Sequence, residues 1–121
     1  MAIPDGIRKE LAELARSKKT RTRDFSKGQP TRWKHYEVEN ITPSSIFIPY
    51  FTEDGAWQFI ADQLDSGHEV EEIKLAKPPG TVGYVMRIFA GDGKPKIYIK
   101  LQKGNGKVIG RSFHYDDPPN S

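Results

Sequence analysis

The first part of the chain carries apolar residues at helical spacing. An apolar residue recurs every three or four positions, at Ile3, Ile7, Leu11 and Leu14. This is the spacing of one face of an α-helix, and Pro4 and Asp5 suit its first turn. The pattern predicts an amphipathic helix over residues 4–17.

A second helix is predicted to follow Thr52. The Thr52 side chain can cap a helix, acidic residues follow it directly, and Ser66 and Gly67 provide a stop. One apolar stripe runs along the segment, formed by Trp57, Ile60, Ala61 and Leu64. We expect this stripe to face the protein core and not a ligand.

From residue 70 onward the hydrophobic period changes from helical to alternating. Four strand-like runs follow one another: VEEIKL (70–75), VGYVMRIF (82–89), KIYIKL (96–101) and KVIGRSFHY (107–115). The last three are separated by AGDGKP and QKGNGK, which are rich in residues that form hairpin turns. The predicted class is α+β, with two helices on one face of a curved, four-stranded, mainly antiparallel sheet.

Alternation along the strands predicts which side chains share a face. In residues 96–101 the apolar set faces the helices and the other set faces outward, comprising Lys96, Tyr98 and Lys100. Arg87 is expected on the same outward face. In the last strand two sets compete, Ile109, Arg111, Phe113 and Tyr115 against Val108, Gly110, Ser112 and His114. Both contain apolar residues, and a bulge near Gly110 would change the register, so the alternation leaves the choice open.

Length and composition indicate one domain spanning residues 1–121. The chain has 36% hydrophobic and 29% charged residues and no cysteine. Within the domain we expect an N-terminal helix (1–17), a basic loop with an irregular connection (18–51), and a helix followed by the antiparallel strands (52–121). The lack of a long apolar run or a secretory leader predicts a cytoplasmic protein without a membrane partner. Cysteine-rich zinc sites and disulfides are excluded.

Charge is distributed in three blocks. Residues 1–36 carry ten basic and four acidic residues, residues 37–72 nine acidic and no Lys or Arg, and residues 73–115 nine basic residues and Asp92 alone. The last block overlaps the predicted sheet and therefore suggests a surface that faces an anion, most commonly nucleic acid. The alternative is a set of surface lysines that serves solubility.

The basic segment SKKTRTRDFSKGQPTRWK has no regular period, and its Gly28 and Pro30 predict a loop or arm. Its aromatic residue Trp33 has two interpretations. It could stack on bases while basic neighbours contact phosphate, or it could anchor the segment to the core.

Basic residues beside His114 and Tyr115 suit cleavage of RNA. The 2′-hydroxyl of RNA can itself attack phosphorus, so a protein need only position it, stabilise negative charge and supply a proton to the leaving oxygen. Histidine suits that proton transfer, and tyrosine can contact a base. The competing interpretation is that His114 merely ends a strand.

Other chemistries find little support. The three histidines show no metal-ligand spacing, so neither a metal nor another cofactor is expected. GDGK and GNGK lie between strands and are turns, not phosphate-binding loops. Ser112 lacks the frame of a hydrolase nucleophile.

The C-terminal stretch VMRIF…KIYIKLQKGNGKVIGRSFHY, about 40 residues, resembles the end of RelE/YoeB-type toxins and of the related MqsR-type toxins. The resemblance implies a RelE-like fold and a metal-independent mRNA interferase of a toxin-antitoxin system. RNA, in some cases ribosome-bound mRNA, and a cognate antitoxin would be its partners. His114 would transfer the proton, Tyr115 would contact a base, Lys96 or Lys100 would supply the strand cation, and Arg87 or Arg111 would stabilise phosphate.

The sequence departs from these toxins in its 50-residue N-terminal region and in lacking a motif-matched acidic base. The alternatives are a non-catalytic module that binds nucleic acid or a regulatory partner, and a protein of phage or mobile-element origin. The predicted catalytic residues are His114, Tyr115, Arg111, Lys96 and Lys100. The predicted RNA contacts are Arg87, Tyr98, Lys94, Lys103, Lys107, Arg21, Arg23, Arg32, Trp33 and Lys34.

Overall fold

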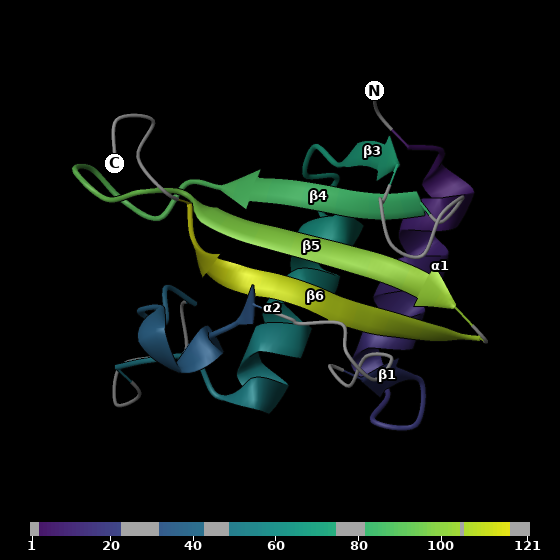
Figure 1. Ribbon diagram of the computed structural model, residues 1–121, viewed down its shortest axis with the longest axis horizontal. Coiled ribbons are helices and arrows are strands. Elements are labelled where there is room, and N and C mark those ends of the chain that lie inside the picture. The colour runs from purple at the N-terminus through teal and green to yellow at the C-terminus, as the bar shows by residue number, and fades with distance from the viewer. Residues whose placement is uncertain (1–2, 23–31, 43–48, 75–81, 105, 117–121) are drawn as a thin grey trace.

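Two helices lie against one face of a β-sheet, which confirms the predicted α+β class (Figure 1). The computed structural model describes residues 3–22, 32–42, 49–74, 82–104 and 106–116. In chain order the elements are α1 (Asp5–Arg16), β1 (Arg21–Thr22), β2 (Arg32–Trp33), the 3-10 helix η1 (His35–Glu37), α2 (Glu53–Asp65), β3 (Glu71–Lys74), β4 (Val82–Ile88), β5 (Ile97–Gly104) and β6 (Lys107–Tyr115). None of the helices in these ranges is both long and apolar enough to cross a membrane.

The sheet is larger and more mixed than the predicted four strands. β3, β4, β5 and β6 form the expected antiparallel series, and the short strands β1 and β2 both pair with β6 in parallel. Part of the segment expected to be a loop therefore belongs to the sheet. These two strands pair with the edge of β6 opposite β5, where backbone groups would otherwise lack partners. Val108 N donates to Thr20 O at 2.9 Å, and Lys34 N donates to Phe113 O at 2.9 Å.

The second helix begins and ends where its sequence predicts. The Thr52 hydroxyl accepts a hydrogen bond from Gly55 N at 3.0 Å, which satisfies one of the free N–H groups of the first turn. After the C-cap Ser66, Gly67 adopts a φ of 86°, a left-handed conformation that ends helices. The buried residues of α2 include all four of the predicted apolar stripe.

The core lies between the helices and the sheet and contains Trp33. Its ring lies 4.8 Å from Trp57 and 5.3 Å from Phe113, measured between centroids, and the residue is 5% exposed. Of the two interpretations of Trp33, the structure shows the core anchor. This corrects its inclusion among RNA contacts, because a buried ring offers no face to a base.

Gly110 is the position where Trp33 comes closest to the backbone of β6. A Cβ atom at Gly110 would lie 2.5 Å from Cζ3 of Trp33, and the packed Trp57 restricts movement of that ring. We expect Gly110→Ala to lower the free energy of unfolding by about 1–3 kcal/mol, as overpacking does. Urea unfolding followed by tryptophan fluorescence measures the change. Gly104→Ala is the matched control, because its added Cβ would meet its nearest neighbour at an ordinary 3.7 Å; equal losses in both variants would contradict the prediction.

Candidate functional site

A β-bulge in β6 decides which of its side chains face away from the helices. Leu101 pairs with Gly110 and Lys100 pairs with Ser112, so Arg111 is the extra residue between two regular stretches. The alternation shifts at this point, which lets both Val108 and Phe113 enter the core. A bulge near Gly110 was an open alternative in the sequence, and the structure shows one. Neither of the two competing sets therefore describes the whole strand.

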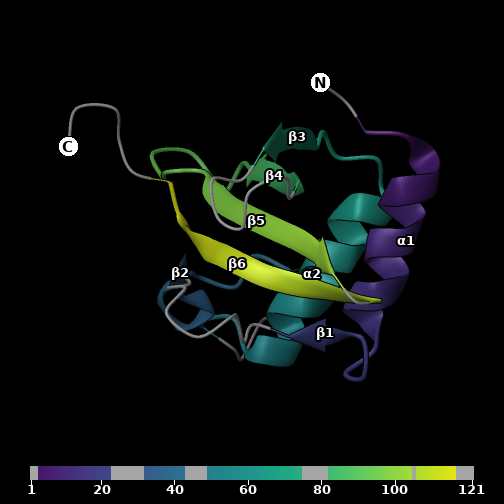
Figure 2. The ribbon, with the colours of Figure 1, turned by 45° about the vertical axis from the view of Figure 1, so that its right-hand side comes forward.

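We call the face of the sheet opposite α1 and α2 the outer face (Figure 2). Its central row consists of cross-strand neighbours: Arg87 pairs with Tyr98, and Tyr98 pairs with His114. The Arg87 guanidinium carbon lies 5.0 Å from the centroid of the Tyr98 ring, and this ring lies 5.3 Å from that of His114 at an interplanar angle of 24°. Both cross-strand neighbours of Tyr98 therefore lie against its ring.

His114 is buried, and one of its ring nitrogens makes no hydrogen bond. Nδ1 lies 2.7 Å from Tyr115 O, and because a carbonyl only accepts, Nδ1 carries the hydrogen. Nε2 is inaccessible to solvent and finds no partner among the described residues. An unsatisfied buried polar group costs about 1–3 kcal/mol, so a group of this kind calls for an explanation such as a functional role.

Two further predicted cations lie on the outer face near His114. Lys100 is the cross-strand neighbour of Ser112, two residues before His114. Arg111 donates from Nη1 to Gln102 Oε1 at 2.7 Å. Burial lowers the pKa of Arg111 from its ordinary value, but an arginine remains a cation at neutral pH.

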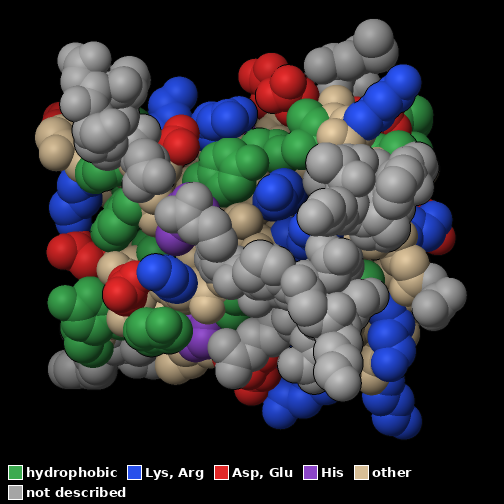
Figure 3. Space-filling view, in the orientation of Figure 1, with side chains coloured by type: hydrophobic (Ala, Val, Ile, Leu, Met, Phe, Trp, Pro, Cys, Tyr) green, Lys and Arg blue, Asp and Glu red, His purple; other side chains and the backbone are tan. Residues whose placement is uncertain are grey.

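Two carboxylates that were not among the predicted site residues contact Arg87. Asp116 Oδ2 lies 3.3 Å from Arg87 Nε, and Glu71 Oε2 lies 3.6 Å from Arg87 Nη1. Figure 3 looks onto the outer face and shows acidic and basic side chains close to one another on it. The outer face is thus mixed in charge, and Arg87 is already paired.

Tyr115 lies on the other side of the sheet from His114. It pairs with Ile97, a core residue, and packs against the hydrophobic core. Its hydroxyl accepts a hydrogen bond from Glu39 N at 3.2 Å. This corrects the expectation that Tyr115 stands beside His114 to contact a base.

Several predicted RNA contacts are ion-paired away from the outer-face row. Lys94 pairs with Glu39, and this hydrogen bond raises the pKa of the lysine. Lys103 lies 2.5 Å from Glu10 of α1, and Arg21 lies 2.5 Å from Asp54 of α2 and over the Trp57 ring. The partners of these cations are acidic residues of α1 and of the acidic segment 37–72.

The remaining predicted RNA contacts are not gathered at His114. Lys34 and Lys107 are exposed, each next to a core-facing strand residue. Arg32 belongs to β2 through its backbone, and Arg23 lies outside the described residues.

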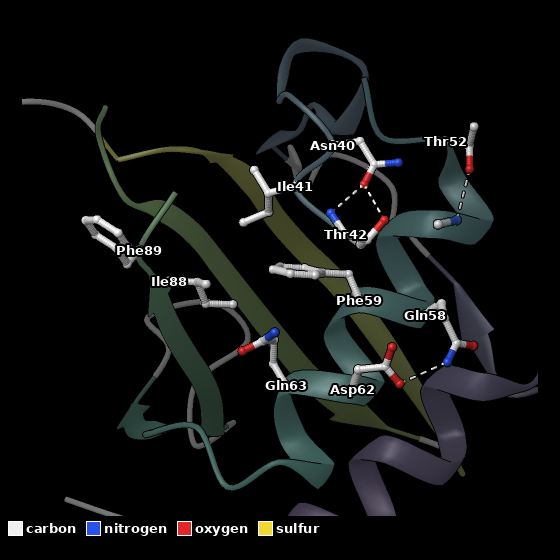
Figure 4. A pocket seen from close by; sticks show the side chains of 11 residues that line it. Asn40, Ile41, Thr42, Thr52, Gln58, Phe59, Asp62, Gln63, Ile88 and Phe89 are labelled. Atoms are coloured by element: carbon white, nitrogen blue, oxygen red, sulfur yellow. Dashed lines mark hydrogen bonds between the residues drawn. The ribbon is translucent and has the colours of Figure 1, made fainter. Parts of the chain in front are cut away.

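A cavity of about 570 Å³ lies on the helix side of the molecule (Figure 4). It is lined by Asn40, Ile41, Thr42, Thr52, Gly55, Gln58, Phe59, Asp62, Gln63, Ile88 and Phe89. Its size and partly apolar lining fall within the range of small-molecule sites. None of the predicted site residues lines it, and its one charged lining residue is acidic, so it does not suit an anion.

Within the described ranges, no three His, Asp or Glu side chains come together as a possible metal site. Comparison of the chain with protein-family models, with curated proteins and with solved structures finds no match.

Proposed function

We propose that this protein is a toxin-like, metal-independent endoribonuclease of RelE-like fold that binds RNA across its outer face in the cytoplasm. The observation that carries the proposal is the position of His114, on the same face as Lys100 and in one cross-strand row with Arg87. The antiparallel series β3 to β6, ending in the His114 strand, supports the likeness to RelE-type toxins. A cognate antitoxin would neutralise the protein by covering this face.

The chemistry needs one proton-transfer group and positive charge. The 2′-hydroxyl of RNA gives its proton to water as its oxygen bonds to phosphorus, the bond from phosphorus to the 5′-oxygen breaks, and the products are a 2′,3′-cyclic phosphate and a 5′-hydroxyl. Protonated at Nε2, the His114 ring gives that proton to the leaving 5′-oxygen while its Nδ1 keeps the bond to Tyr115 O. Lys100 and Arg111 stabilise the charge on the phosphate oxygens.

The burial of His114 favours a second candidate function. Because Nε2 is inaccessible, it must become exposed before RNA reaches it. A non-catalytic module that binds RNA through the outer-face lysines Lys96 and Lys100 needs no such exposure. The two candidates differ in one result, which is cleavage.

Incubation of the purified protein with RNA tests the proposal. Single-stranded RNA of mixed sequence and ribosome-bound mRNA are each treated with micromolar protein in the presence of a chelator. We expect fragments ending in 2′,3′-cyclic phosphate, together with growth arrest when the protein is expressed in bacteria. If neither the free RNA nor the ribosome-bound mRNA is cleaved, the endoribonuclease proposal is wrong and the non-catalytic RNA-binding module remains.

Neutralising the outer-face lysines should weaken RNA binding. For Lys96→Gln combined with Lys100→Gln, we expect a Kd raised by roughly tenfold and a salt slope reduced by about 1.4, because each lost phosphate contact on a single strand removes about 0.7. Fluorescence anisotropy across a salt series measures both. Lys103→Gln is the control, since Lys103 is paired with Glu10; an equal loss there would place the RNA elsewhere.

A further inference from the structure

The outer face carries a small polar pocket at the edge formed by β3 and β4. Its volume is about 180 Å³, and its lining residues are His68, Glu69, Glu71, Val85, Arg87 and Lys96. Two cations and a histidine thus meet around one cavity together with two carboxylates, Glu69 and Glu71. The cations distinguish it from the larger cavity, whose one charged lining residue is acidic. The pocket is separate from His114, which does not line it.

The nitrogen-bearing side chains suit a phosphate group. Arg87 Nε is held by Asp116 at 3.3 Å, and its two Nη groups offer the donors that match phosphate oxygens. Lys96 adds an exposed ammonium group. His68 Nδ1 donates to Glu69 O at 2.9 Å, so the ring can donate from Nε2 to a phosphate oxygen in its protonated form. The backbone of His68 is held by Arg8 of α1, whose Nη1 donates to His68 O at 2.6 Å.

Glu71 occupies the position for which a phosphate would compete. Its carboxylate lies 3.6 Å from Arg87 Nη1, and the two side chains are 52% and 45% exposed. An ion pair this exposed is largely screened by water and contributes little. A doubly hydrogen-bonded phosphate can therefore displace Glu71, while the carboxylate lowers the apparent affinity.

We propose that this pocket binds a phosphate of the RNA strand next to the phosphate at His114, in competition with Glu71. This rests on the proposed binding of RNA across the outer face. Arg87 connects the two places, because it lines the pocket and also lies over the Tyr98 ring, which stacks on His114. An RNA strand that runs across β4, β5 and β6 along the row of Arg87, Tyr98 and His114 would pass both the pocket and His114.

The test uses two probes that cannot be cleaved, inorganic phosphate and a short 2′-deoxy oligonucleotide. Their binding is followed by the NMR shifts of the His68 ring and of Arg87 Nε. We expect Glu71→Gln to bind both probes about twofold to fivefold more tightly, the equivalent of the exposed ion pair that is removed. Arg87→Gln should lose most of the binding. The matched control is Glu10→Gln, which breaks the Lys103 pair on the helix side and should leave both affinities unchanged.

Equal or weaker binding by Glu71→Gln, or probe binding that leaves the His68 ring unshifted, would overturn the phosphate site. The cleavage assay is a separate measurement. If the wild type never cleaves RNA but Glu71→Gln binds the probes more tightly, the endoribonuclease fails and the phosphate site stands. If the wild type cleaves RNA but Glu71→Gln binds the probes no more tightly, the endoribonuclease stands and the phosphate site fails.

Discussion

Replacing His114 by asparagine is expected to reduce RNA cleavage by roughly 100-fold to 10,000-fold, the usual contribution of a general acid or base. The asparagine amide can still donate to Tyr115 O, as Nδ1 of His114 does, but it cannot transfer a proton at neutral pH. RNA binding should stay within about twofold of the wild type, because the basic side chains responsible for phosphate contacts are untouched. Rates come from single-turnover cleavage of labelled RNA, and affinity comes from anisotropy.

Because His114 is only 8% exposed, its replacement can also disturb folding. Circular dichroism and urea unfolding of the variant separate the two effects. His35→Asn provides the same chemical change in η1, away from the outer-face row, and should cleave at the wild-type rate. If folded His114→Asn cleaves as fast as the wild type, His114 has no role in proton transfer.

Replacing Phe113 by alanine is expected to lower the free energy of unfolding by about 3–5 kcal/mol, which is typical of a buried aromatic residue. Phe113 is fully buried, and its ring centroid lies 5.2 Å from that of Phe51 and 5.3 Å from that of Trp33. These two neighbours come from segments that precede α2, so the variant loses contacts that join three parts of the chain. Urea denaturation monitored by circular dichroism measures the loss.

Phe89→Ala is the matched control for Phe113. Phe89 is 65% exposed, so its truncation should change stability by no more than about 0.5 kcal/mol. A loss below about 1 kcal/mol for Phe113→Ala would mean that the core is arranged differently around β6.

The long periodic segments could be predicted from the sequence, and the short ones could not. The 13-residue α2 and the nine-residue β6 contain enough positions to show their periods. β1 and β2 contain two residues each, so no pattern can form, and their pairing depends on the distant β6. The alternation in β6 was ambiguous because one extra residue, Arg111, separates stretches of opposite phase.

The candidate site was predictable only in part for a similar reason. Lys96 and Lys100 could be placed on one face from the alternation of their strand, and Arg87 could be expected there because its charge favours the open face. Counting charges by segment, however, does not show which cations have partners. Glu71 and Asp116 lie just outside the basic block of residues 73–115, yet both reach Arg87 within 4 Å in the fold. Only the cross-strand register brings them there.

The position of β6 within the sheet sets an order of events during synthesis. Arg21 pairs with Val108 and Arg32 with Ser112, so both N-terminal strands depend on the strand that leaves the ribosome after all the others described. Contacts between such distant segments form slowly, because a long loop must close first. A nascent chain that lacks β6 has neither these pairs nor the face that carries His114. If the proposed activity is correct, the protein cannot attack RNA until β6 has been synthesised and has joined the sheet.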